Sequence, residues 1–192
     1  MNANWILSAL QKRSTWTLDE AYRLVEQHKS DIRSHIPTIR QLACQAEIIV
    51  ELGVRYGVST IALMAGKPKR MVSYDINVPP NLKTLQSLLP GRWEFRQGDS
   101  RKVDIPGCDL LFIDTVHTAE QISEELRKHA SQVRRWIAAH DTESFPEIRR
   151  PLEELVKSGG WHIVYTSSED NGLWVLERIS GRNDARTFAQ QP

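Results

Sequence analysis

Short apolar runs alternate along the chain with stretches whose apolar residues recur every three or four positions. The runs predict buried strands, since strands covered on both faces read as nearly continuous apolar segments. Five such strands are expected, at residues 48–52, 70–75, 93–97, 110–114 and 135–139. Helices are expected between and after them, over residues 59–65, about 81–89, 118–131 and 146–158. This alternation is typical of an α/β fold, a parallel sheet with helices on both faces.

Signals for helix starts support these elements and add two helices before the first strand. The spacing of a capping box occurs at Thr17 and Glu20, at Thr118 and Gln121, and at Ser144 and Glu147. The first of these begins an amphipathic stretch, and a second helix is expected from about Pro37 to Gln45. Residues 1–45 therefore predict N-terminal helices that form a cap or lid in front of the sheet.

The end of the chain follows a different pattern. Gly159 and Gly160 stop the last helix, and no helical pattern follows over residues 161–179. Turn-forming residues at 168–172 divide this segment into two strands, which predicts a β-hairpin with one strand antiparallel to the sheet. The polar residues 180–192 predict a mobile tail.

Composition excludes several classes of function. The 25 Lys and Arg residues and the 24 Asp and Glu residues are interspersed, so no basic stripe suggests a nucleic-acid groove. The apolar runs fall far short of the roughly 18 residues that a membrane span needs, and the N-terminus lacks the features of a signal peptide. The isolated Cys44 and Cys108 suit a reducing compartment. We therefore expect a cytoplasmic protein of one domain, without a nucleic-acid partner.

A glycine-containing turn follows the first strand, at the sheet edge where ligands of open α/β folds bind. Gly53 and Gly57 let the backbone turn tightly and approach a ligand, and Ser59 starts a helix whose amide groups can receive a carboxylate. Glycines here can also serve packing alone, and a short glycine pattern is weak evidence by itself. Asp75 favours a ligand, because it ends the second strand about 20 residues later, where an acid accepts both ribose hydroxyls of a nucleoside.

The ends of other strands narrow the choice of nucleoside. Asp99 and Ser100 end the third strand and suit the amino group and ring nitrogens of adenine. The loop lacks the G-x-G-x-x-G spacing of dinucleotide sites, and Glu51 would lie awkwardly beside a pyrophosphate. The same acid would suit the ammonium group of S-adenosylmethionine, which the terminal hairpin also favours. S-adenosylmethionine is therefore the preferred cofactor, and an NAD-dependent oxidoreductase is the less favoured alternative.

Five segments in this order, VELGVRYGVST, VSYDI, QGDS, LLFIDTVHTAEQISEEL and HDT, resemble the class I S-adenosylmethionine-dependent methyltransferases. The most similar branch, over roughly residues 36–179, is the small O-methyltransferases, which include catechol, caffeoyl-CoA and cephalosporin-hydroxylase-like enzymes. The resemblance implies a Rossmann-like seven-stranded sheet with an antiparallel C-terminal hairpin strand, and a cofactor-binding domain over residues 46–179. It implies cofactor contacts at Glu51, Gly53, Val54, Gly57, Ser59, Asp75, Ile76, Asp99, Ser100 and Asp114.

Side chains at the ends of the fourth and fifth predicted strands could activate a methyl acceptor. Asp114 and His117 follow the fourth strand, and His140 and Asp141 follow the fifth. Hydroxyl groups are poor nucleophiles near neutral pH, so methyl transfer to oxygen needs a base or a divalent cation. In metal-dependent relatives these strand ends supply the metal carboxylates, which implies a site for Mg²⁺ or another divalent cation at Asp114, His140 and Asp141. A nitrogen ligand at 140, where several relatives have an acid, shifts the preference toward a transition metal.

His117 resembles the general base that some relatives carry three residues after the metal aspartate, and the ordinary pKa of histidine, about 6.5, suits that role. The catalytic residues expected are therefore His117, Asp114 and Asp141. Structural roles are the alternative, since Asp114 can cap the helix near Thr118 and His140 can bond to the backbone.

The favoured function is O-methylation of a small hydroxylated acceptor such as a sugar, a polyol or a catechol-like molecule, since two adjacent hydroxyls could chelate the metal. A catalytically inactive module that binds S-adenosylmethionine or S-adenosylhomocysteine is the alternative. A homodimer is compatible with either function.

Overall fold

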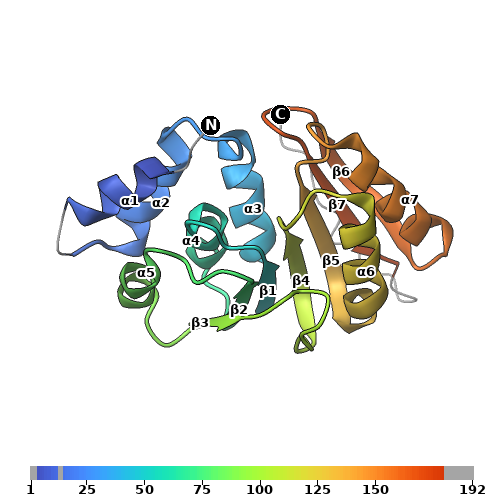
Figure 1. Cartoon of the computed structure of the whole chain (residues 1–192), viewed down its shortest axis with the longest axis horizontal. Helices are drawn as coiled ribbons and strands as arrows, with labels where there is room; N and C mark the ends of the chain where they lie inside the picture. The colour runs from blue at the N-terminus through green and yellow to red at the C-terminus, as the bar shows by residue number, and fades with distance from the viewer. Residues whose placement is uncertain (1–3, 13–14, 180–192) are drawn as a thin grey trace.

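The computed structural model describes residues 4–12 and 15–179, which form one seven-stranded sheet with helices on both faces (Figure 1). The strands are β1 (Ile48–Leu52), β2 (Arg70–Asp75), β3 (Trp93–Gln97), β4 (Cys108–Ile113), β5 (Val133–His140), β6 (Trp161–Ser167) and β7 (Leu173–Arg178). Their order across the sheet is β3-β2-β1-β4-β5-β7-β6. Neighbouring strands pair in parallel except β7, which is antiparallel to both β5 and β6. The predicted α/β sheet and its C-terminal hairpin are therefore confirmed.

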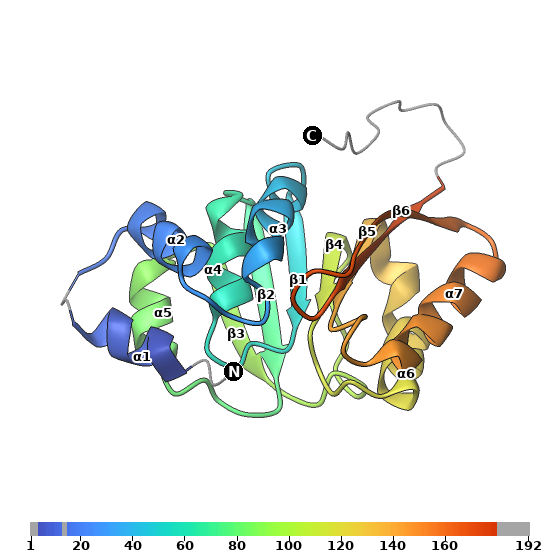
Figure 2. The same ribbon diagram turned by 90° about the horizontal axis from the view of Figure 1, so that it is seen from above.

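The helices form two groups on opposite sides of the sheet (Figures 1 and 2). One group is α1 (Asn4–Gln11), α2 (Leu18–Gln27), α3 (Ile36–Ala43), α4 (Val58–Ala65) and α5 (Leu82–Leu88). The other group is α6 (Ala119–His129) and α7 (Arg149–Lys157). Consecutive residues of β1 pack against opposite groups, Ile49 against the first and Val50 against the second. This two-sided burial explains why the inner strands read as continuous apolar runs.

Local helix signals are confirmed at two places and overridden at a third. The N-caps predicted at Thr17 and Thr118 are present, the former as a full capping box. The box predicted at Ser144 is wrong, because the short 3-10 turn before α7 begins without any side-chain cap. The backbone amide of Ser144 instead donates to the carbonyl of Asn171 in the hairpin turn, at 3.2 Å. A tertiary contact has thus replaced the local one.

The N-terminal helices belong to the same buried cluster as the sheet. Helices α2 and α3 pack on α4, with Val25, Ile39 and Leu42 fully buried. A lid role for residues 1–45 stays a prediction, and the predicted tail at 180–192 lies outside the described residues. Over the described ranges, every helix is too short or too polar to cross a membrane.

The strand order reverses between β1 and β4, with β2 and β3 on one side and β5 to β7 on the other. The connections after β1 and β4 therefore leave the sheet in opposite directions, which opens a crevice beyond the carboxyl ends of the strands. The residues predicted to bind ligands lie in or just after the strands that meet at this edge.

Candidate functional site

A cavity of about 550 Å³ occupies this crevice. It is lined by the connections after β1 to β5, by Asp31 and Ile32 ahead of α3, and by Asn171 of the hairpin turn. Most of the predicted site residues line it: Gly53, Val54, Ser59, Asp75, Ile76, Asp99, Ser100, Asp114, His117, His140 and Asp141. The predicted positions thus converge on one cavity, and only Glu51 and Gly57 lie outside its walls.

The loop after β1 passes close to the end of β4. Gly53 has a φ of 90°, and a Cβ atom there would lie 2.0 Å from the carbonyl oxygen of Asp114, so only glycine allows this approach. Gly57 has a φ of 80° at the start of α4, and a Cβ atom there would lie 2.7 Å from Leu85 of α5. Gly53 therefore shapes the cavity wall, whereas Gly57 serves the packing of α4 on α5.

Asp75 holds this loop from the end of β2. Its Oδ2 accepts hydrogen bonds from the amides of Val54 (2.8 Å) and Arg55 (2.9 Å), and its Oδ1 accepts one from Asn77 (2.9 Å). Three bonds leave about one of the roughly four acceptor positions of the carboxylate for a ligand hydroxyl. The side chain predicted to bind ribose therefore also fixes the glycine loop.

Glu51 lies beneath the cavity instead of on its wall. Its side chain is fully buried, and its oxygens accept hydrogen bonds from the hydroxyls of Ser59 (2.6 Å), Thr60 (2.8 Å) and Ser73 (2.6 Å). Burial raises the pKa of Glu51 to about 7, against the opposing effect of the three hydroxyls. The expectation that this carboxylate faces an ammonium group does not fit this position. A side chain inside a strand points to a face of the sheet, and this one points toward α4.

Two sets of polar contacts, one exposed and one buried, support the cavity wall beyond β3. Asp99 accepts two hydrogen bonds from the guanidinium of Arg101, each of 3.1 Å, which lower the pKa of Asp99 to about 2. Ser100 donates to the buried Glu125 (2.5 Å) and accepts from Gln121 (3.0 Å). Sequence reasoning assigned Gln121 only a capping role and missed Glu125, although their i,i+4 spacing on one face of α6 is a usable signal.

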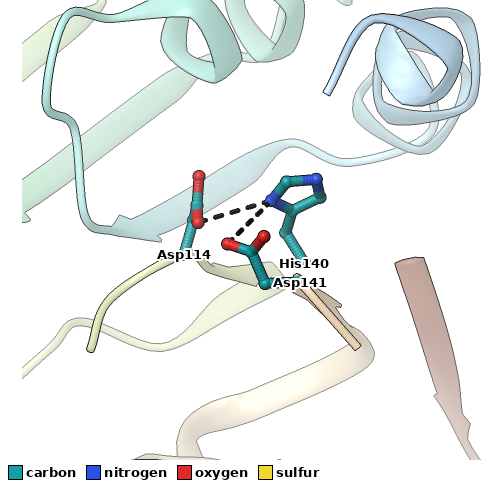
Figure 3. Close-up of side chains that lie close together, drawn as sticks. All are labelled: Asp114, His140 and Asp141. Carbon is teal, nitrogen blue, oxygen red and sulfur yellow. Dashed lines mark ion pairs between the residues drawn. The ribbon is translucent and has the colours of Figure 1, made fainter. Parts of the chain in front are cut away.

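Two carboxylates and two imidazoles meet where β4 and β5 end. Nδ1 of His140 lies 3.5 Å from Oδ1 of Asp114 and 3.3 Å from Oδ2 of Asp141, and Figure 3 shows the ring turned toward both. Nε2 of His117 lies 2.6 Å from Oδ2 of Asp141, without hydrogen-bond alignment, and 3.5 Å from Oδ1 of Asp114. His140 and Asp141 are buried, whereas Asp114 and His117 are partly exposed. The predicted catalytic and metal residues thus form one cluster.

These four groups change one another's protonation. Burial disfavours the charged imidazoles, but Asp114 and Asp141 outweigh it and raise the pKa of His117 to about 9 and that of His140 to about 10. Burial likewise disfavours the charged carboxylates, yet the imidazoles hold the pKa of Asp141 far below its ordinary value. With only these four groups present, His117 is therefore protonated near neutral pH and is not a base.

Residues outside the predicted set hold this cluster in place. Nε2 of His140 lies 3.2 Å from the backbone carbonyl of Asp31, so the predicted backbone bond of this histidine is present beside its carboxylate contacts. The side chain of Asn171 donates to Oδ1 of Asp141 at 2.6 Å. The backbone amide of Asn171 donates to the same Asp31 carbonyl at 3.4 Å. The segment before α3 and the hairpin turn therefore meet over the cluster, which no local sequence pattern indicates.

The cluster also has the donors of a metal site. Asp114, His140 and Asp141 each offer one ligand atom, and these atoms lie within 4.8 Å of one another. Nδ1 of His140 is buried without a hydrogen-bond partner of normal geometry in the part of the chain that the structure describes. Since a buried polar atom without a partner is costly, these residues fit a divalent cation held between the three side chains.

No sequence model of a known protein family matches the chain, and a search of curated protein sequences finds no match. Solved structures do match. The O-methyltransferase from Bacillus cereus in complex with SAH (S-adenosyl-L-homocysteine) is 17% identical, with a TM-score of 0.65 over 91% of this chain and 96% of that chain. A Klebsiella pneumoniae protein proposed to be an O-methyltransferase is 17% identical, with a TM-score of 0.65 over 92% and 96%. The N-methyltransferase NodS from Bradyrhizobium japonicum, also in complex with SAH, is 12% identical, with a TM-score of 0.63 over 91% and 99%.

These likenesses show that the chain has the fold of these methyltransferases, and they confirm the predicted resemblance at the level of the fold.

Proposed function

We propose that the chain is an S-adenosylmethionine-dependent methyltransferase that transfers a methyl group to a hydroxyl group of a small acceptor. The observation that carries the proposal is the shared cavity, whose walls include Asp75 and Asp99 as well as Asp114, His117 and Asp141. One cavity thus holds groups suited to a nucleoside together with groups suited to proton transfer. This combination favours a reaction between a bound cofactor and a second small molecule. The methyltransferase fold supports the same assignment.

The cofactor would bind at the ends of β1, β2 and β3. Asp75 is suited to the ribose, and Asp99 and Ser100 to the adenine. Ile76 is 63% exposed in the same wall and offers an apolar surface to the base. Amide groups at the start of α4, near Ser59, suit the carboxylate of the methionine end. This arrangement leaves the ends of β4 and β5 for the methyl group and its acceptor.

The acceptor would lie against two exposed apolar side chains beside the acid–histidine cluster. Val116 and Phe145 line the cavity, and the ring of Phe145 lies 4.5 Å from that of His117. An acceptor with a flat or apolar face next to its hydroxyl group suits these walls, since aromatic rings stack on such faces. A sugar, through the apolar face of its ring, or a catechol-like molecule meets this description.

The chemistry requires removal of a proton from the acceptor. A divalent cation held by Asp114, His140 and Asp141 would act as a Lewis acid on the acceptor oxygen. Nε2 of His117 faces Oδ2 of Asp141 at 2.6 Å, so we assign the other ring nitrogen, Nδ1, to take the proton, with the contact at Nε2 orienting the ring. The raised pKa of His117 comes from the charges of the two carboxylates, so their neutralisation returns the imidazole toward its ordinary pKa, where it can accept a proton near neutral pH.

Calorimetry separates this proposal from a nicotinamide-dependent oxidoreductase. S-adenosylhomocysteine is expected to bind the wild-type chain at micromolar concentration, and NAD⁺ and NADH are not. Binding of NAD⁺ or NADH without binding of S-adenosylhomocysteine would contradict the proposal.

Turnover separates it from an inactive binding module. The assay follows methyl transfer from radiolabelled S-adenosylmethionine to a panel of sugars, polyols and catechols. His117→Ala is expected to keep S-adenosylhomocysteine binding and to lose at least about 100-fold in turnover, the usual contribution of a general base. His162→Ala, at an exposed position of β6, is the matched control and should turn over like the wild type. Cofactor binding by the wild type with no methylated acceptor across the panel would favour the module.

A further inference from the structure

Glu51 and Ser59 connect the interior of the protein to the cavity wall. Ser59 lines the cavity at the start of α4, and its hydroxyl lies 2.6 Å from Oε1 of the fully buried Glu51. The N-cap of α4 is Gly57, which has no side chain to accept from the first amides of the helix. The proposed function places the methionine carboxylate of the cofactor at these amides. A carboxylate bound there would be separated from that of Glu51 by little more than one hydroxyl group.

The directions of the hydrogen bonds leave one contact of Glu51 free to reverse. The indole of Trp93 donates to the hydroxyl of Ser73 at 2.8 Å, because an indole nitrogen can only donate. Ser73 donates its own hydrogen to Oε2 of Glu51 at 2.6 Å, and Thr60 donates to the same oxygen at 2.8 Å. Since Oε2 already accepts two bonds, a proton is accommodated more readily on Oε1, which faces Ser59.

The charge of Glu51 therefore decides where the hydroxyl hydrogen of Ser59 points. When Glu51 is ionised, Oε1 accepts this hydrogen, and Ser59 cannot donate into the cavity. When Oε1 carries a proton, Glu51 is the donor, and Ser59 can donate to a carboxylate in the cavity. Protonation also removes a negative charge that would repel such a ligand at short range.

The surroundings of Glu51 suit a change of charge near neutral pH. The residues opposite it on β2 and β4 are the uncharged Ser73 and Phe112, and α4 contains no charged side chain. Asp75, at the end of β2, has its oxygens occupied by backbone amides. Burial raises the pKa of Glu51 to about 7, and the charge of Asp114, after β4, acts in the same direction.

We propose that Glu51 and Ser59 couple cofactor binding to the uptake of one proton. When the carboxylate of the cofactor binds at the start of α4, Oε1 of Glu51 takes a proton from the solvent and donates a hydrogen bond to Ser59. The hydroxyl of Ser59 then donates to the bound carboxylate. Glu51 is thus a positioning residue that acts through Ser59. This inference deepens the proposed function and rests on its choice of cofactor.

Calorimetric titration of the full chain with S-adenosylhomocysteine at pH 6 and pH 8 tests the coupling. With a pKa of about 7, the protonated fraction of Glu51 falls about 10-fold between these pH values. The wild type should therefore lose about 10-fold in affinity relative to Glu51→Gln, whose amide imitates the protonated acid. Glu47→Gln makes the same change at an exposed position paired with Lys69 and should follow the wild type. The same pH dependence in the wild type and in Glu51→Gln would overturn the proposal.

A second measurement uses the wild-type chain alone, so its result does not depend on how a variant folds. Calorimetry at pH 8 in buffers of different ionisation enthalpy counts the protons taken up on binding. S-adenosylhomocysteine should take up close to one proton more than 5′-methylthioadenosine, which has the same nucleoside and sulfur but no carboxylate. Equal uptake with the two ligands would overturn the proposal.

The same samples keep the two proposals apart. Binding of S-adenosylhomocysteine without the extra proton would refute the coupling alone. The extra proton without methyl transfer to any acceptor of the panel would refute the methyltransferase alone. No binding of S-adenosylhomocysteine at either pH would refute both.

Discussion

Replacing Glu51 by glutamine should remove a pH dependence from the stability of this fold. The carboxylate is fully buried and accepts hydrogen bonds from the hydroxyls of Ser59, Thr60 and Ser73. Glutamine can keep all three contacts. Its oxygen can accept the bonds that Thr60 and Ser73 donate to one carboxylate oxygen, and its amide can donate to the hydroxyl of Ser59. Glu51→Gln thus removes the charge and retains the network.

The expected magnitude follows from the pKa of the buried acid. Burial raises the pKa of Glu51 from its ordinary 4.5 to about 7. Between these values the folded chain keeps a proton that the unfolded chain has lost, so stability falls as the pH rises from about 4.5 to about 7 and is constant above. A tenfold change in proton affinity is worth about 1.4 kcal/mol, so the whole effect amounts to about 3 kcal/mol. The wild type should lose this stability when the pH rises, and the variant should not. The free energy of unfolding of Glu51→Gln minus that of the wild type should therefore increase by about 3 kcal/mol when the pH is raised from about 4.5 to 8.

Urea unfolding of both proteins at the two pH values, followed by tryptophan fluorescence, measures this gain. The other titrating groups are common to both proteins, so their contributions cancel in the difference. Glu47→Gln is the matched control, because it makes the same change at an exposed position paired with Lys69. A surface pair of this kind contributes at most about 1 kcal/mol, so the control should follow the wild type within that margin. The reasoning is refuted if Glu51→Gln differs from the wild type by the same amount at both pH values.

Three further substitutions test the walls of the cavity. Gly53→Ala should lower the free energy of unfolding in urea by at least about 3 kcal/mol, because its Cβ atom would lie 2.0 Å from the carbonyl oxygen of Asp114, just after β4. Gly91→Ala is the control, because Gly91 has a φ of 76° but open space around the new Cβ atom, and it should lower the free energy of unfolding by only about 1 kcal/mol. Equal losses for the two variants would contradict the close approach of Gly53 to Asp114. Asp75→Asn should weaken S-adenosylhomocysteine about 10-fold or more in calorimetry, since charged hydrogen bonds contribute about 1.5–3 kcal/mol, and unchanged affinity would remove its ribose role. Asn171→Ala should weaken Co²⁺ binding about 10-fold in calorimetry, because the side chain of Asn171 orients the carboxylate of Asp141. Unchanged binding would remove that role of Asn171.

Features that follow from single strands could be predicted from the sequence. The inner strands are covered on both faces and so read as apolar runs, and Asp75, Asp114 and Asp141 share one edge because parallel strands end on the same side. Glu51 is the residue whose surroundings differ most from the expectation. It lies in the expected strand 48–52, but its register opposite Ser73 directs its side chain toward the face that α4 covers and not toward a ligand in the loop. The hydroxyl residues on α4 and β2 were the signal for this burial.

Features that arise where distant loops meet could not be predicted in the same way. Asn171 reaches the cluster because the hairpin turn docks on the connection after β5, where a Cβ atom on Gly172 would lie 2.4 Å from the amide nitrogen of Glu143. Asp31 reaches it because the segment before α3 crosses the same turn. No sequence periodicity or short spacing predicts either contact. Asp31 lies more than a hundred residues from its partner His140, and Asn171 lies 30 residues from its partner Asp141.

The contacts of Asp31 also constrain how residues 1–45 could act as a lid. The carbonyl of Asp31 accepts from both His140 and Asn171, and nearby the amide of Ser34 donates to the side chain of Asp170 at 2.8 Å. If this segment moved away from the hairpin turn, the ring of His140 would lose the contact that directs Nδ1 toward the two carboxylates. Opening of such a lid and loosening of the acid–histidine cluster would therefore be one event. In the proposed methyltransferase, release of product and loss of the geometry of the cluster would then be coupled through the carbonyl of Asp31.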